Sequence, residues 1–187
     1  MAKKLMLLGM AVVAFAALAL PAVASAAPAL TEPAGTLVPK GATIVGTSTN
    51  STTVTSAGTL TCAKVTVTGE VTENTGSSVK GVAKGEGKTE GCKLGSSSLT
   101  ITDPTLLAIS SNTPGKGVVS LTFIADLFGI PCHFVGNNLP FTYTSGSDSM
   151  SIAGTLTGTS GFPCPSSGSF SGTYTLETSN GTPLILD

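Results

Sequence analysis

Four cysteines and a single histidine are the residues of this sequence whose types could support redox, metal or nucleophilic chemistry. The sequence has no C-x-x-C pair among its four cysteines, which are Cys62, Cys92, Cys132 and Cys164. His133 is its only histidine. Because a structural zinc site draws on closely spaced Cys and His ligands, this spacing disfavours zinc. The chain also lacks an Asp/Asn ladder with calcium-loop spacing. The sequence therefore predicts no bound metal and no cofactor.

The same four cysteines are expected to form two disulfides if the chain is exported. Three pairings are possible for four cysteines. Cys62 and Cys92 are 30 positions apart, and Cys132 and Cys164 are 32 positions apart. We favour closing each of these two spans, because each flanks a stretch long enough for a hairpin.

Catalytic patterns are weak throughout the sequence. A serine triad would need His133 as its base, but this histidine adjoins a disulfide candidate, which favours a structural role. The segment 77–80 matches S-x-x-K, a pattern short enough to occur by chance in a serine-rich chain. Glu70 and Glu73 could pair for glycoside hydrolysis, but their odd spacing predicts opposite faces of a strand. The sequence predicts no catalytic residue, and a secreted hydrolase is the least favoured function.

Residues 1–26 have the three parts of a secretory signal peptide. Lys3 and Lys4 are followed by an apolar run over residues 5–20, and Ala24-Ser25-Ala26 supplies the small residues of a cleavage site. The alternative is an uncleaved membrane anchor, although the apolar run is short for a bilayer. Cleavage after Ala26 would leave a 161-residue chain without a membrane span. We expect it to be secreted and extracellular, with association with the cell surface as the open alternative.

The composition of residues 27–187 excludes some classes of partner. Seven lysines, no arginine and ten acidic residues give a net charge of −3, which offers no footprint for nucleic acid or anionic membranes. Thr and Ser make up 50 of these 161 residues, as in some disordered stalks. Regularly alternating apolar residues argue instead for a folded chain. We expect an extended lead-in over residues 27–40 and a single β-rich domain over residues 41–187.

Period-two alternation of apolar and polar residues predicts the fold class. It is clearest over residues 119–127, 139–143, 150–156 and 170–176, and it is weaker over residues 60–71. Turn residues separate these runs, and no amphipathic helix of useful length appears. The prediction is an all-β, antiparallel sandwich or barrel-like domain with two disulfides.

Details of several strands can also be predicted. A change of phase between Cys62 and Val65 predicts a β-bulge, and Pro104 is expected to end the strand that begins near Leu99. The apolar patches 106–109 and 128–130 are assigned to strand ends or loops. The last residues, 184–187, are expected to form a final edge strand.

Charged residues alternate with small ones over residues 80–90, where lysine or glutamate occupies nearly every even position. The favoured interpretation is a charged edge strand or hairpin that blocks association between sheet edges. The alternative is a docking surface for a charged partner.

Several blocks resemble a known group of proteins. The segments 60–76 and 91–92, Pro131-Cys132-His133-Phe134-Val135-Gly136, and 164–174 with its Cys-Pro-Ser-Ser-Gly-Ser-Phe order are similar to uncharacterised secreted four-cysteine proteins of actinobacteria. The resemblance covers most of residues 58–178. It implies an exported β-rich protein and supplies no catalytic residues.

Together these features favour a structural or binding protein of the cell envelope or extracellular space. The alternative is an adhesion module that binds carbohydrate or protein. The absence of Trp argues against a sugar-binding face, since Tyr143 and Tyr174 fall at apolar strand positions and are expected in the core. The expected partner is a cell-envelope polymer or a surface protein.

Overall fold

The fold consists of antiparallel strands. The computed structural model describes residues 27–187, so the predicted signal peptide lies outside the described residues. The strands in this part of the chain are β1 (Leu30–Thr31), β2 (Thr43–Ser48), β3 (Ser51–Thr55), β4 (Gly58–Cys62), β5 (Lys64–Asn74), β6 (Val79–Ala83), β7 (Lys88–Glu90), β8 (Lys93–Leu94), β9 (Ser97–Ser98), β10 (Ile101–Thr113), β11 (Lys116–Leu127), β12 (Ile130–Tyr143), β13 (Ser149–Gly158), β14 (Ser167–Thr178) and β15 (Ile185–Leu186). The predicted all-β class is confirmed.

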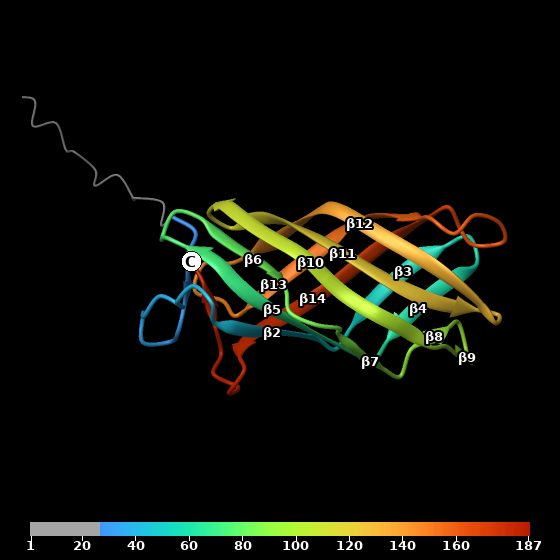
Figure 1. Cartoon of the computed structure of the whole chain (residues 1–187), viewed down its shortest axis with the longest axis horizontal. Coiled ribbons are helices and arrows are strands. Elements are labelled where there is room, and N and C mark those ends of the chain that lie inside the picture. Colours follow the sequence, from blue (N-terminus) through green and yellow to red (C-terminus); the bar gives the residue numbers. More distant parts are fainter. Residues whose placement is uncertain (1–26) are drawn as a thin grey trace, which may run out of the picture.

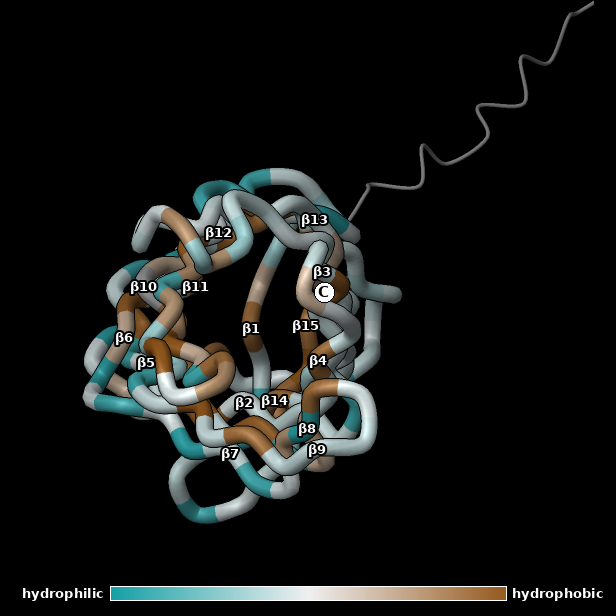
Figure 2. The backbone as a smooth tube through the Cα atoms, turned by 90° about the vertical axis from the view of Figure 1, so that its right-hand side faces the viewer, coloured by the Kyte–Doolittle hydropathy of each residue, from teal (hydrophilic) through white to brown (hydrophobic). Residues whose placement is uncertain are grey.

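Eight of these strands close into a ring in the order β13, β12, β11, β10, β6, β5, β2 and β14, and β14 pairs back to β13. β14 pairs through its first half with β3 and through its last residues with β2. Strands β4, β8 and β9 extend the sheet from β3. Figures 1 and 2 show the elongated shape and the ring of strands seen from one end. The structure is thus the barrel-like form of the predicted fold.

Strand alternation places the core inside this ring. In β11, the alternate residues Val119, Leu121, Phe123, Ala125 and Leu127 are all buried, as their spacing predicts. The serines and threonines between such residues face outward, where β-branched and hydroxyl side chains suit a pleated surface. The two tyrosines of the chain lie in the core, as expected.

β10 departs from the sequence prediction. It runs through Pro104 without ending, so the expectation that this proline terminates the strand was wrong. The pairing with β11 shifts register between Thr102 and Thr105, and Asp103 takes a positive φ of 51°. This irregularity accommodates a residue without an N–H. The patch 106–109 consequently lies inside the strand, which corrects its assignment to a strand end or loop.

The phase change after Cys62 proves to be a break between two strands. β4 ends at Cys62 and pairs with β3, whereas β5 begins at Lys64 and pairs with β2. The predicted bulge is therefore a corner at Ala63. Residues 128–129 form the turn between β11 and β12, as their assignment to a strand end or loop allowed.

The two chain ends of the described residues close one end of the ring. β1 pairs with β15, so the predicted final strand exists and lies against the segment expected to be a lead-in. Leu30 and Val38 from that segment are buried beside Leu184 and Leu186. Figure 1 places these segments at the end opposite the β8–β9 hairpin. The other end of the ring carries the β11–β12 turn and the 159–166 loop.

Candidate functional site

Both disulfides are formed in the favoured pairing. Cys62 is bonded to Cys92, and Cys132 is bonded to Cys164. No free cysteine remains among the described residues. We use "stapled end" for the β8–β9 hairpin, the β11–β12 turn and the 159–166 loop, because these three segments adjoin Cys92, Cys132 and Cys164.

His133 lies on β12 with an exposed side chain. Its backbone N–H donates to the Ser160 hydroxyl at 2.8 Å, and its carbonyl accepts from the N–H of Thr159 at 3.0 Å. These contacts hold the 159–166 loop against β12. Within residues 27–187, no hydroxyl or carboxylate is hydrogen-bonded to the imidazole, so the geometry of a catalytic triad is not assembled around it.

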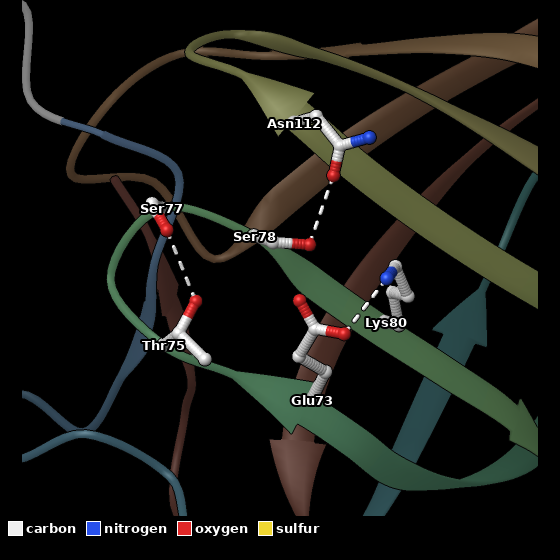
Figure 3. A network of polar contacts seen from close by, with 6 residues as sticks. All are labelled: Glu73, Thr75, Ser77, Ser78, Lys80 and Asn112. Carbon is white, nitrogen blue, oxygen red and sulfur yellow. Dashed lines mark hydrogen bonds and ion pairs between the residues drawn. The ribbon is translucent and has the colours of Figure 1, made fainter.

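The S-x-x-K segment lies in the β5–β6 turn and the first residues of β6 (Figure 3). The Ser77 hydroxyl is 3.1 Å from that of Thr75, and the Lys80 ammonium donates to Glu73 at 2.7 Å. Hydrogen bonds from Lys80 and then Ser78 hold the pKa of the Glu73 carboxyl below its usual value. The Lys80 side chain is thus hydrogen-bonded to Glu73, and Ser77 has Thr75 as its hydroxyl partner.

The glutamates of β5 are not arranged as the sequence predicts. The β5–β6 register shifts between Val71 and Glu73, so Glu70 and Glu73 both face outward rather than opposite ways. Each carboxylate forms an ion pair with a lysine, Glu70 with Lys84 at 3.1 Å and Glu73 with Lys80 at 2.7 Å. Two carboxylates held by separate lysines do not make the acid–nucleophile pair of a glycosidase.

The charged segment 80–90 is the predicted edge only in part. β6 pairs with β5 on one side and β10 on the other, so the expectation of an edge strand was wrong for β6. Among the described strands, β7 pairs with β5 alone, as predicted for an edge strand, and its Glu90 lies 3.9 Å from Lys64. The charged side chains of this segment form ion pairs with side chains of opposite charge on the neighbouring β5, namely Lys80 with Glu73, Lys84 with Glu70 and Glu90 with Lys64.

Metal-binding and membrane-spanning features can be assessed for residues 27–187. No group of three or more His, Cys, Asp or Glu side chains in this range could hold a metal ion. In the same range, no helix has the length and apolar character needed to cross a membrane.

The stapled end carries a surface groove of about 290 Å³. It lies between the β8–β9 hairpin and the β11–β12 turn. Its apolar lining comes from Leu94, Leu99, Phe128 and Gly129, and its polar lining from Ser97, Ser98, Thr100 and Asp126. We call this the Phe128 groove.

Backbone hydrogen bonds and a disulfide fix the walls of the Phe128 groove. The N–H of Leu99 donates to the carbonyl of Cys92 at 2.9 Å. The N–H of Asp126 donates to the carbonyl of Thr100 at 3.0 Å. Cys92 precedes the hairpin and is bonded to Cys62 of β4. The groove is therefore built on a cross-linked scaffold.

Phe128 is the unusual residue of this groove. Leu127 pairs with Ile130, so Phe128 and Gly129 form a two-residue turn with φ values of 58° and 84°. Such a turn favours Asn-Gly or Gly-Gly, because a bulky residue at positive φ is strained. The side chain is nonetheless 83% exposed. Burial of the ring thus does not compensate for the strain, which is a pattern that often marks function.

Two other hollows are less suited to binding a ligand, one because of its volume and one because of its lining. A hollow lined in part by Tyr174 measures about 40 Å³, far below the roughly 300 Å³ typical of a ligand pocket. A hollow of about 380 Å³ between β7 and β10 is lined by Glu86, Lys88, Glu90 and Asp103 without an aromatic ring. Among the described residues, the Phe128 groove combines an exposed aromatic ring, hydroxyls and a carboxylate. Sequence analysis missed it, because residues 94–100 and 126–129 adjoin only in the fold.

Comparison with protein-family models, with curated protein sequences and with solved structures gives no match. The resemblance to secreted four-cysteine proteins of actinobacteria stays a prediction.

Proposed function

We propose that this chain is an extracellular, non-enzymatic binding protein of the cell envelope, and that it engages its partner through the Phe128 groove. The signal-peptide pattern of residues 1–26 and the two closed disulfides support export to an oxidising compartment. The resemblance to secreted four-cysteine proteins agrees with this location.

One observation carries the binding role. Phe128 holds an apolar ring in solvent on a backbone conformation that costs an L-residue roughly 1–2 kcal/mol. Neither packing nor turn chemistry explains this choice of residue. A ligand that covers the ring would explain it, since turns and loops held by a rigid scaffold commonly carry binding residues.

The arrangement of the candidate catalytic residues supports a role other than hydrolysis. His133 has an exposed side chain and contacts the Ser160 hydroxyl through its backbone N–H, and Lys80 forms an ion pair with Glu73. A binding module needs neither group to be activated.

Co-sedimentation with isolated cell envelopes tests this proposal. The exported, disulfide-bonded protein is mixed with envelopes of the producing cells, and the bound fraction is measured over a concentration series. We expect saturable binding that Phe128→Asn weakens at least tenfold. Val118→Thr serves as the control, because Val118 is also exposed and lies on β11 about 33 Å from Phe128.

Two results would contradict the proposal. Absence of saturable binding would remove the envelope as the partner. Binding that is equally strong in wild type and Phe128→Asn would instead favour a structural matrix protein that associates through other surfaces.

A further inference from the structure

We propose that the Phe128 groove binds an uncharged pyranose unit of a polysaccharide, an inference that rests on the proposed binding function. A pyranose ring has one face of C–H groups and an edge of hydroxyls. The groove offers a matching pair of surfaces: an aromatic ring on one side, and hydroxyls with a carboxylate on the other.

The aromatic surface is the exposed ring of Phe128, so the absence of Trp and the burial of both tyrosines do not exclude a sugar-binding face. Its π face carries partial negative charge, and the C–H hydrogens of a sugar carry partial positive charge, so the two attract on close packing. Because the ring is 83% exposed, it can be covered without displacing another side chain. Leu94 and Leu99 supply further apolar contact within the groove.

The polar surface is centred on Asp126. An ionised carboxylate accepts hydrogen bonds at both oxygens, which suits two neighbouring hydroxyls of a sugar ring. Ser97, Ser98 and Thr100 add hydroxyls that can both donate and accept. No ion pair involving Asp126 is present among the described residues, so its carboxylate is free to accept from a ligand.

Charge selects against anionic ligands. Asp126 is the only ionisable side chain that lines the groove, and the described chain carries more acidic than basic residues. A phosphate, a uronate or an anionic lipid headgroup would meet this carboxylate in a groove whose lining contains no lysine. The lining therefore favours an uncharged sugar over an acidic polymer or an anionic membrane.

Size and rigidity are consistent with recognition of one or two sugar units. The volume of about 290 Å³ lies at the lower end of the roughly 300–1,000 Å³ range of small-molecule sites. The groove is open, as needed for a unit within a long chain. Its disulfide-anchored walls reduce the entropy lost when the ligand binds.

Pull-down on defined polymers tests the inference with the full exported protein. The probes are chitin, cellulose and the protein-free, lipid-free polysaccharide fraction of the producing cells' envelopes. We expect saturable binding to at least one of them and competition by its soluble oligosaccharides. Phe128→Asn and Asp126→Asn should each weaken binding tenfold or more, whereas Val118→Thr should not. Thermal melts and the near-ultraviolet circular dichroism of each variant establish that it is folded.

The outcomes separate this inference from the proposed function. Binding to whole envelopes but to none of the three polymers would overturn the sugar ligand and leave the binding function standing. Phe128-dependent binding to phosphatidylcholine or phosphatidylglycerol vesicles, without binding to the polymers, would overturn it in favour of a lipid surface. Polymer binding that is unchanged in both groove variants would also overturn the assignment to this groove.

Discussion

At the scale of single residues, the positive φ of Phe128 should lower the stability of the fold at the site proposed for binding. Replacing it by Asn gives the Asn-Gly pair that a two-residue turn with two positive φ values prefers. We expect Phe128→Asn to stabilise the fold by roughly 1 kcal/mol, seen as a rise of about 2–4 °C in the melting temperature. A melting temperature that is unchanged or lower would show that the ring stabilises the folded chain and would weaken the functional interpretation.

Glu73 gives a second residue-scale prediction. Its pKa is lowered from 4.5, chiefly by the hydrogen bond from Lys80 and least by the charge of Lys40. Lys80→Met should therefore raise the Glu73 pKa toward 4.5, and Lys40→Met should move it less. Carboxyl-carbon NMR titration measures both. Because the depressed pKa favours the folded state only above the unfolded pKa, any stabilisation is lost as pH falls below 4.5. An unchanged pKa in Lys80→Met would contradict the pairing.

Tyr174 gives a third prediction, at high pH. Burial raises the pKa of its phenol from 10.0 to about 12. The folded chain thus retains a proton that the unfolded chain releases between these values, so stability falls as pH rises from 10 to 12. The full shift corresponds to roughly 3 kcal/mol. Urea unfolding at pH 8, 10 and 11 should show this fall in wild type and less of it in Tyr174→Phe. Equal slopes for both proteins would contradict the assignment.

The disulfide pairing and the burial of individual side chains could be predicted from the sequence where they depend only on the spacing of residues along the chain. The pairing of Cys62 with Cys92 and the burial of Tyr174 follow from span length and strand phase. The role of Phe128 could not be predicted, because Leu-Phe-Gly-Ile carries none of the dipeptides that usually signal such a turn. The outward direction of Glu73 depends on a register shift that no local pattern in the chain reveals.

At the scale of elements, alternation predicts strands best where one face is buried without interruption. It succeeded for β11, β13 and β14. It failed for β10, where Pro104 is a strong strand breaker but falls at a bulge. It also failed for β6, because two-sided pairing depends on distant strands and not on the charges of the segment.

The disulfides allow a prediction at the element scale. Their sequence separations are 30 and 32, so the chain-entropy model assigns each roughly 3–4 kcal/mol of stabilisation. We expect Cys62→Ala/Cys92→Ala and Cys132→Ala/Cys164→Ala to lose similar free energies of unfolding in denaturant titrations. Hydrogen exchange should rise around β8 and β9 in the first variant and around residues 159–166 in the second. Strongly unequal losses would show that packing, and not loop closure, sets their contribution.

At the scale of the whole molecule, residues 27–38 and 184–187 close one end of the ring, and the groove lies at the other. The buried Leu30 and Val38 arrive from a segment that sequence analysis described only as an extended lead-in. Its composition gave no sign of docking, because the contacts come from Asn74 and β15, far away in the chain. The closed end therefore lies apart from the groove proposed for binding at the stapled end.

Asn74 allows this closure to be tested. Its amide donates to the carbonyls of Leu30 at 2.6 Å and Val38 at 3.0 Å, and its oxygen accepts from the N–H of Leu30 at 3.2 Å. Asn74→Ala should cost about 1–3 kcal/mol and Leu30→Ala about 2–5 kcal/mol. Because both substitutions release the same segment, the double variant should lose clearly less free energy of unfolding than the sum of the two single losses.

Asn112→Ala is the control. It removes one exposed hydrogen bond and should cost under about 0.5 kcal/mol. Strict additivity in urea unfolding would mean that residues 30–38 do not dock as a unit.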